Sequence, residues 1–231
     1  MRAGACLWSA RVTSTFEVVR SVLKTERPPH LRVVSSGAAA QVSQPTDDEI
    51  VEAVEQGDAE IAEALYDRLG PVVRATLVRV LGKRDAEHDD LVQTAFEQIF
   101  VSLARRRYAG VCSLRSWAIS ITINVALNAL RKRRTERRYV DNLLDSRQLE
   151  VAGRISDPER AAQVVALREE LASLSPGTAE VIVLFEVMGC DLAEVAAATG
   201  LSVSAAQSRL VRGRSELRAR LDARQGKKGW S

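Results

Sequence analysis

Cysteine and histidine are scarce in this chain, and their spacing excludes the common metal sites. The 231 residues include three cysteines, Cys6, Cys112 and Cys190, and two histidines, His30 and His88. The cysteines have no C-x-x-C spacing and the histidines are isolated from them, so the sequence predicts no metal site. We expect each cysteine to be a small residue of the core rather than a redox sensor, because inert buried cysteines are the common case.

The chain also lacks the patterns that common classes of enzyme share. No histidine is near a nucleophile, no carboxylate pair is flanked by metal ligands, and no glycine-rich phosphate loop is present. We therefore expect a protein that is not an enzyme and that needs no cofactor.

Long apolar runs are missing as well. No stretch is long enough to cross a membrane, and the first residues, MRAGACLWSARV, lack the apolar core of a signal peptide. Free thiols suit a reducing compartment. The sequence therefore predicts a cytoplasmic protein without membrane insertion.

Charge is plentiful but unevenly distributed. The formal net charge is only +3, yet arginine and lysine concentrate in residues 105–107, 131–138 and 209–228, and acidic residues concentrate in 47–63. Such segregation indicates local basic surfaces. Nucleic acid is the first partner to consider, although an acidic protein partner or a solvated surface would give the same local composition.

Apolar residues recur at helical spacing in the chain after residue 45, and strand signals are absent. Thr46 and Glu49 form a capping box that predicts the start of the first helix. Three further helices are predicted at residues 58–82, about 89–103 and 114–138. The predicted fold class is therefore all-α.

A polar stretch with weak periodicity separates these helices from a second helical part. Helices in the second part are predicted at 157–174, 175–189, 191–200 and 202–224. We expect two small helical domains joined by a flexible linker. The segments are a flexible N-terminal extension at 1–45, a first domain at 46–138, a linker at 139–157, a second domain at 158–224 and a basic tail at 225–231.

The last two predicted helices have a helix-turn-helix pattern, in which Gly200 can take the positive φ that the turn requires. Residues expected to pack inward are Ala193, Val195, Ala196, Leu201, Val203, Ala206 and Leu210. Residues expected to face outward are Ser204, Gln207, Ser208 and either Val211 or Arg212, flanked by Arg209, Arg214 and Arg218. A helix of this width fits the major groove, so the pattern predicts DNA binding. An αα-hairpin with solvated arginines is the alternative.

The helix predicted at 114–138 begins apolar and ends cationic. A solvated helix end would give the same cationic run, because cations favour the helix C-terminus. The apolar first half, however, can hold the helix on a bundle and leave a polar track exposed to phosphate. The expected anchors are Trp117, Ile121, Val125, Ala126 and Leu130. The expected track comprises Asn124, Asn128, Arg131 and the later arginines.

Three segments, in this order, resemble the sigma factors of bacterial RNA polymerase, specifically the small extracytoplasmic-function group that has only sigma regions 2 and 4. DDLVQTAFEQIF at 89–100 resembles the helix of that family that binds core polymerase. LRSWAISITINVALNALRKRR at 114–134 resembles its minus-ten helix, and SVSAAQSRLVRGRSELRARL at 202–221 resembles its minus-thirty-five recognition helix. The resemblance covers about residues 47–221.

This resemblance implies a protein that binds core polymerase, recognises minus-ten and minus-thirty-five promoter elements, helps to melt DNA and starts transcription of a specific regulon. The implied partners are core RNA polymerase, through the clamp helices of its largest subunit and the flap of its second-largest subunit, promoter DNA, and an anti-sigma protein. The residues implied in polymerase binding are Asp90, Leu91, Gln93 and Phe96.

The residues expected at the minus-ten element are Arg105, Arg106, Tyr108, Trp117, Asn124, Asn128, Arg131 and Arg134. Those expected at the minus-thirty-five element are Ser204, Gln207, Ser208, Arg209, Val211, Arg212 and Arg214. The loop at 105–113 is expected to accept an extruded base, because a pocket and nearby cations can offset the cost of unstacking. Tyr108 in this loop is the available aromatic side chain, or else a cap on the core.

The alternative function is a helix-turn-helix regulator that is not a polymerase subunit. It explains the second domain but assigns no role to the segments at 89–100 and 114–134. Polymerase binding discriminates between the two readings. For a sigma factor with a linker, we further expect that the free protein samples compact states in which the basic tract 131–138 is partly covered, and that an inhibitory partner stabilises such a state.

Overall fold

Every regular element that the structure describes is a helix, in agreement with the predicted all-α class. The structure is a computed structural model that describes residues 45–56, 59–82, 84–141 and 158–228. The first part contains α2 (Asp47–Gln56), α3 (Ala59–Leu81), α4 (His88–Ala104) and α5 (Leu114–Asp141). The second part contains α6 (Pro158–Ser173), α7 (Pro176–Ile182), the π-helix η2 (Val183–Met188), α8 (Leu192–Thr199) and α9 (Val203–Lys228).

The start of α2 shows the predicted capping box. Thr46 Oγ1 accepts a hydrogen bond from the backbone N–H of Glu49 at 3.3 Å, and Glu49 Oε2 accepts one from the N–H of Thr46 at 2.7 Å. Asp47 then ties three helices together. It pairs with Arg68 of α3 at 2.5 Å and accepts a hydrogen bond from the backbone N–H of Leu114, at the start of α5, at 2.9 Å.

Helices α3, α4 and α5 pack around aliphatic side chains that recur every three or four residues. Pro71 lies inside α3, and the helix continues to Leu81. Side chains of this core that are almost completely buried are Leu65, Leu69, Val73, Leu77, Ala95, Ile99, Leu103, Leu114, Ile123 and Leu127. Burial of this apolar surface is the main force that holds the three helices together.

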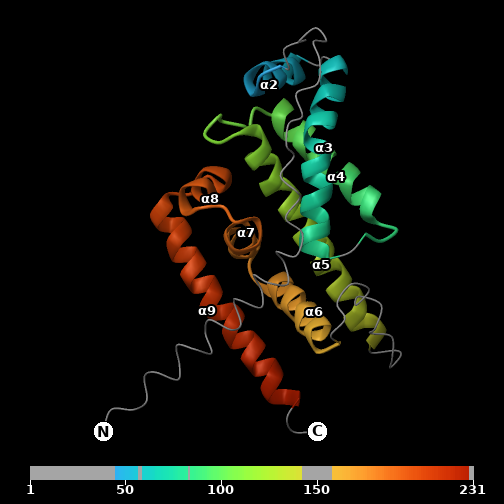
Figure 1. The fold of residues 1–231 in the computed structure, drawn as a ribbon, viewed down its shortest axis with the longest axis vertical. Helices are drawn as coiled ribbons and strands as arrows, with labels where there is room; N and C mark the ends of the chain where they lie inside the picture. Colours follow the sequence, from blue (N-terminus) through green and yellow to red (C-terminus); the bar gives the residue numbers. More distant parts are fainter. Residues whose placement is uncertain (1–44, 57–58, 83, 142–157, 229–231) are drawn as a thin grey trace, which may run out of the picture.

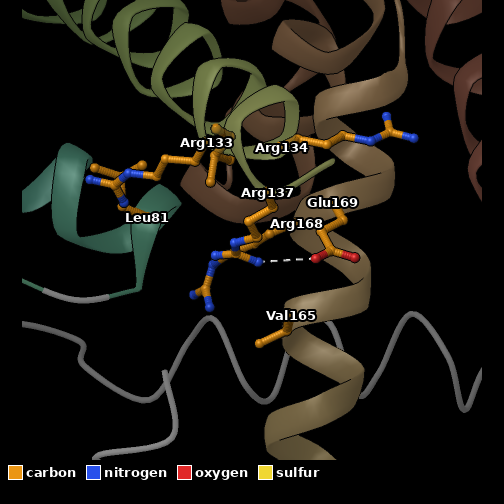
Figure 2. A pocket seen from close by; sticks show the side chains of 8 residues that line it. Leu81, Arg133, Arg134, Arg137, Val165, Arg168 and Glu169 are labelled. Atoms are coloured by element: carbon orange, nitrogen blue, oxygen red, sulfur yellow. Dashed lines mark hydrogen bonds and ion pairs between the residues drawn. The ribbon is translucent and has the colours of Figure 1, made fainter. Parts of the chain in front are cut away.

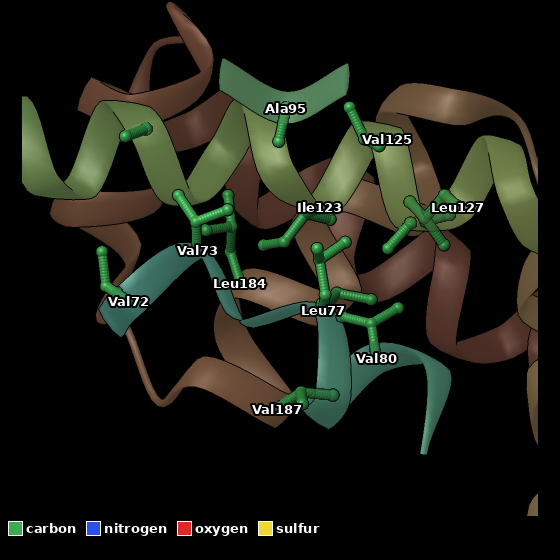
Figure 3. Packing of buried hydrophobic residues seen from close by; sticks show 14 of the residues in the cluster. Val72, Val73, Leu77, Val80, Ala95, Ile123, Val125, Leu127, Leu184 and Val187 are labelled. Carbon is green, nitrogen blue, oxygen red and sulfur yellow. The ribbon is translucent and has the colours of Figure 1, made fainter. Parts of the chain in front are cut away.

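The second part of the chain packs directly on the first, so that one continuous core runs through both. Figure 1 shows α6 and α7 (orange) against the long helix α5 (green). Figure 3 shows Leu184 and Val187 of η2 beside Leu77 and Val80 of α3 and Ile123 of α5. The two predicted bundles are therefore closed on each other in this structure.

Three details differ from the sequence predictions. Helix α5 continues to Asp141, three residues beyond its predicted end, and α9 continues to Lys228. The helix predicted at 175–189 changes from α7 to the wider π-helix η2, and it ends as predicted at Gly189, which has φ of 78°. The extension before residue 45, with Cys6 and His30, and the predicted linker from residue 142 onward lie outside the described residues.

Candidate nucleic-acid interface

The residues predicted to bind polymerase lie on α4, but they do not share one surface. Asp90 and Gln93 are exposed, Leu91 is half-buried, and Phe96 is 4% exposed. Gln93 donates a hydrogen bond from Nε2 to Glu97 Oε1 at 3.0 Å, which extends the polar edge by one turn. The exposed part of the predicted site is therefore a strip of polar side chains.

Phe96 belongs to the core rather than to this strip. Its ring centroid lies 4.4 Å from that of Tyr66 in α3 and 6.3 Å from that of Phe100. The prediction that Phe96 belongs to the polymerase-binding surface does not fit this conformation, because its ring fills the space between α3 and α4. In this conformation Phe96 positions α4 and does not reach a partner.

The segment 105–113 is a loop between α4 and α5, as predicted. Arg105 and Arg106 are exposed, and Arg106 has φ of 53° and pairs with Glu55 at 3.1 Å. The Tyr108 hydroxyl donates a hydrogen bond to the carbonyl of Cys112 at 2.5 Å, and its ring lies 5.3 Å from that of Trp117. Tyr108 thus caps the core in this conformation, which matches the second of its two predicted roles.

Helix α5 presents only part of its predicted polar track to solvent. Asn128 is exposed and accepts a hydrogen bond from Arg131 Nη1 at 2.7 Å. Arg131 is half-buried, its Nη2 has no hydrogen-bond partner, and burial lowers the pKa of its guanidinium. Asn124 is also half-buried, so the prediction that it lies on an exposed track is wrong for this conformation.

Asn124 is covered because α7 lies on this stretch of α5. Its amide donates a hydrogen bond to the carbonyl of Ser120 at 3.2 Å, and it lies close enough to the Glu180 carboxylate on α7 to lower the pKa of that group. The hydroxyl of Ser120, a residue only 6% exposed, also donates to Glu180. Burial raises the pKa of the Glu180 carboxyl, and the bonds from Ser120 and Asn124 and the charge of Arg209 act in the opposite direction.

The basic end of α5 is partly neutralised by carboxylates. Arg133 pairs with Asp85 at 2.7 Å and with Glu87 at 2.8 Å, in the turn that precedes α4. Arg137 pairs with Glu169 of α6 at 3.1 Å (Figure 2). The Arg133 pairs lie within the first part of the chain, and the Arg137 pair joins it to the second, which is consistent with a basic tract that is partly covered in a compact state.

A small cavity of about 40 Å³ lies between the end of α5 and α6 (Figure 2). Its lining residues are Leu81, Leu130, Arg133, Arg134, Arg137, Val165, Arg168 and Glu169. Arg168 donates from Nε to the carbonyl of Val80 at 3.0 Å, and burial lowers the pKa of its guanidinium to about 10. Arg168 therefore contacts α3 from α6 and holds the two parts of the chain together.

The helix-turn-helix forms as predicted. Asp191 and Glu194 make a reciprocal capping box at the start of α8, with both hydrogen bonds at 2.8 Å. Gly200 has φ of 67° in the turn. Four of the predicted inward residues are buried, namely Val195, Ala196, Ala206 and Leu210. Leu201 is half-buried, whereas Ala193 and Val203 are exposed, and for these two the prediction is wrong because each lies in the first turn of its helix on the solvent side.

The outer face of α9 presents Ser204, Gln207 and Ser208 as predicted, together with both of the alternatives, Val211 and Arg212. Ser204, Gln207, Ser208, Val211 and Arg212 are exposed, and Val211 is 58% exposed although it is apolar. Arg212 folds back to donate from Nε to the carbonyl of Ser208 at 3.3 Å. This face is available for base and phosphate contacts without any rearrangement of the fold.

The flanking arginines are less free than predicted. Arg214 donates from Nε to Glu186 Oε1 of η2 at 2.7 Å, and its guanidinium lies 5.1 Å from the centre of the Phe185 ring. Glu186 is 5% exposed, so Arg214 neutralises a buried carboxylate. Arg209 lies over α7, where a Cβ added to Gly177 would approach its Nη1 to 2.6 Å. Arg214 thus stabilises the fold of the domain, and its contact with phosphate stays a prediction.

Sequence reasoning did not identify Ser120, Glu180, Arg168 or the partner of Arg214. Each of these residues acts through a contact between helices that are far apart in the chain, so no local spacing signals it. Gly213 is a further case, because a Cβ there would lie 2.5 Å from Thr178 Cγ2, and glycine lets α9 approach α7. The glycines at 177 in α7 and 213 in α9 are the signal that a helix-packing argument could have used, because each allows the other helix to come close.

No group of three or more His, Cys, Asp or Glu residues is arranged to hold a metal ion in the part of the chain that the structure describes. His88 is buried with no hydrogen-bond partner at either ring nitrogen, and Cys112 and Cys190 are free, half-buried thiols. Among the described helices, none combines the length and apolar character needed to span a membrane.

Comparison with known proteins places both parts of the chain in one family. Residues 65–136 match sigma-70 region 2, and residues 165–217 match sigma-70 region 4. The RNA polymerase sigma factor CnrH of Cupriavidus metallidurans is 34% identical over 160 residues, which cover 66% of this chain and 82% of that protein. The RNA polymerase sigma factor CarQ of Myxococcus xanthus is 30% identical over 168 residues, which cover 73% of this chain and 93% of that protein.

Among solved structures, that of CnrH in complex with the cytosolic domain of CnrY matches with a TM-score of 0.43. The match has 27% sequence identity and covers 77% of this chain and 97% of that chain. The sequence relatives and the two matched regions are sufficient to assign the family. This chain belongs to the RNA polymerase sigma factors, in the extracytoplasmic-function group, and its function is to direct transcription initiation at promoters.

Proposed function

We propose that three helices of this sigma factor have separate binding roles. Helix α4 binds core polymerase, α5 with the preceding loop binds the minus-ten element, and α9 reads the minus-thirty-five element. The observation that carries this assignment is the outer face of α9, where Ser204, Gln207, Ser208 and Arg212 are exposed after the turn of the helix-turn-helix. Such a face fits the major groove of DNA.

The proposed domains follow the same division. Residues 46–138 form the region 2 domain and 158–224 the region 4 domain, with the linker at 139–157, an extension at 1–45 and a basic tail at 225–231. In complex with polymerase, the two domains bind the clamp helices of the largest subunit and the flap of the second-largest subunit. Both domains can reach their promoter elements together only after they separate.

Run-off transcription tests the proposal directly. Purified protein, core polymerase and genomic fragments should give discrete transcripts that are absent without the protein, and the protein should co-purify with core polymerase. Specific DNA binding without any polymerase binding would instead support a helix-turn-helix regulator. The transcripts would also identify the promoters for the experiments below.

The loop at 105–113 is proposed to form part of the minus-ten site when α5 is uncovered. Tyr108 would have to leave its hydrogen bond with the Cys112 carbonyl to stack on an extruded base. Exchange of this loop for that of another sigma factor should change the minus-ten preference and leave the minus-thirty-five preference unchanged. If neither preference changes, the loop is only a connector.

We also propose that the protein acts in the cytoplasm, without catalytic activity of its own, and that an anti-sigma protein restrains it. The contacts between the two parts of the chain support a restrained state, because an inhibitor that binds both parts would stabilise it. Cell fractionation tests the compartment. Affinity purification of the tagged protein before and after induction tests the partner, which should be lost when transcription starts.

A further inference from the structure

Helix α7 is positioned between the two helices that are proposed to read DNA. It packs against α5 on one side and α9 on the other (Figure 1). On the α9 side the approach is close, since Gly213 faces Thr178 and Ile182, and Arg209 lies over Gly177. A change in the position of α7 therefore affects both DNA-binding elements at once.

Glu180 is the residue of α7 that faces α5. Its neighbours Val181 and Ile182 in α7 are buried, and Ser120 on the facing turn of α5 is 6% exposed. Its carboxylate accepts a hydrogen bond from the hydroxyl of Ser120, and the amide of Asn124, one turn further along α5, lies near enough to lower its pKa. A buried carboxylate needs such donors, because burial without them is costly.

The groups around Glu180 are those that a DNA strand would need. Ser120, which donates to it, is one helical turn before Asn124, a predicted minus-ten residue, and the charge of Arg209, a predicted minus-thirty-five residue, also acts on it. A carboxylate presents acceptor oxygens and negative charge, as a phosphate or a base carbonyl does. While Glu180 holds these donors, nucleic acid cannot reach the Ser120–Asn124 turn.

We propose that Glu180 is an internal competitor of promoter DNA, which locks α7 on the Ser120–Asn124 turn of α5 in the free protein. The lock must open before this turn binds a DNA strand, and core polymerase favours the open state by binding the separated domains. This inference rests on the proposed role of α5 at the minus-ten element. It adds a named residue and a defined contact through which the compact state blocks DNA.

Two substitutions test whether Glu180 holds α7 on α5 without disturbing the fold. Glu180→Arg cannot accept the hydrogen bonds and repels Arg209, so it should release α7 from α5. Glu180→Gln keeps an acceptor oxygen for Ser120 and Asn124, so it should stay closed. Glu216→Arg is the matched control, because it makes the same charge change on an exposed residue of α9 that pairs with Arg220 at 2.6 Å.

The position of the domains is measured by the distance between labels on Ala104→Cys in α4 and Ala219→Cys in α9, both exposed positions, with the three native cysteines replaced by alanine. The second measurement is the affinity of the free protein for a random-sequence single-stranded oligonucleotide. Circular dichroism and thermal unfolding confirm that each variant is folded.

We expect a longer label distance and an affinity for the oligonucleotide raised by about fivefold or more in Glu180→Arg, a coupling of the usual allosteric size. Glu180→Gln and Glu216→Arg should match the wild type in distance, and Glu216→Arg should raise the affinity much less than Glu180→Arg. An unchanged distance in Glu180→Arg would overturn the proposal. So would equal gains in affinity from both arginine variants, or opening of Glu180→Gln as far as Glu180→Arg.

Run-off transcription with core polymerase distinguishes failure of this inference from failure of the function. If the wild type gives no transcripts, the sigma assignment of α5 fails and the lock fails with it. If the wild type gives transcripts but Glu180→Arg leaves the label distance unchanged, only the lock is wrong. With polymerase present, wild type and Glu180→Arg should reach the same long distance.

Discussion

The two helices proposed to read DNA differ in how the free protein presents them. In α9, Gln207, Ser208 and Arg212 are exposed and need no rearrangement. In α5, Asn124 is half-buried next to Ser120, whose hydroxyl donates to Glu180 of α7, and Trp117 packs on Tyr108. An open surface can bind on first encounter, whereas a covered surface binds only after the molecule has changed shape. We infer that the two promoter elements are bound by different states of the protein.

Helix α4 adds a third surface to this comparison, and its polar strip is open like that of α9. Asp90 and Gln93 are exposed although the two parts of the chain are closed on each other. If α4 is the polymerase site as proposed, the closed protein can begin to bind polymerase before α5 is free. This order would keep α5, the proposed minus-ten helix, away from DNA until a polymerase is present.

The largest effect is expected at the open strip of α4. The double substitution of Asp90→Ala and Gln93→Ala should weaken core binding by about a hundredfold or more, because each truncation leaves partner groups unpaired in the complex. Run-off transcription should be lost as well. Binding is measured by co-purification and by titration of labelled core polymerase.

Gln98→Ala is the matched control, since Gln98 is an exposed residue of the same helix. It should bind core polymerase like the wild type. Unchanged binding in the double variant, with normal helical content, would show that the polar strip of α4 is not the polymerase site.

The second prediction compares two arginines of α9 that lie on different sides of the helix. Arg214→Ala leaves the buried Glu186 carboxylate without its partner and should lower the free energy of unfolding by about 2 kcal/mol, less than for a fully buried pair because Arg214 is partly exposed. Arg212→Ala should change it by less than about 0.5 kcal/mol. Urea denaturation measures both, and equal losses would show that the Glu186 contact does not stabilise the domain.

These contrasts also show which features sequence could predict. The helix starts at Thr46 and Asp191, the turn at Gly200 and the exposed face of α9 all follow from patterns within a few residues, and they appear as expected. Local hydrogen bonds and helical periodicity determine such features, so a local pattern is sufficient to find them.

The positions that sequence reasoning misplaced depend on contacts between distant helices. Asn124 was expected in solvent because its own helix allows it, and the position of α7 decides otherwise. Phe96 and Arg214 were assigned to partners for the same reason, although the core between α3 and α4 and the carboxylate of Glu186 hold them. A sequence motif predicts which face of a helix is functional, but it does not predict which other helix packs on that face.

The third prediction tests whether the open face of α9 reads DNA as assigned. Gln207→Ala should relax the preference at one base pair of the minus-thirty-five element by about 1 kcal/mol, because glutamine can bind adenine through both amide atoms. Arg209→Ala should weaken binding to all sequences and reduce the salt slope by about one. Competition binding with single-base variants, repeated at several salt concentrations, measures both. The opposite pattern would mean that the helix is rotated relative to this assignment.

The smallest effect concerns pH and the covered surface of α5. Burial raises the pKa of Glu180 above its ordinary value of 4.5 in the closed state, whereas solvent surrounds this carboxyl when the domains separate. A group with a raised pKa binds its proton more tightly in the closed state, so the contribution of the proton to closure is fully present below 4.5 and is lost as the pH rises through the raised value. The effect is small because Ser120 and Asn124 of α5 and Arg209 of α9 favour the charged form of the carboxyl.

The label distance between α4 and α9 should therefore be shorter at acid pH and lengthen slightly toward neutral pH, in low salt. Glu180→Gln should remove this dependence while other carboxylates still titrate. A wild-type distance that lengthens on acidification, or a dependence that persists unchanged in Glu180→Gln, would show that Glu180 does not set the balance between the closed and open states.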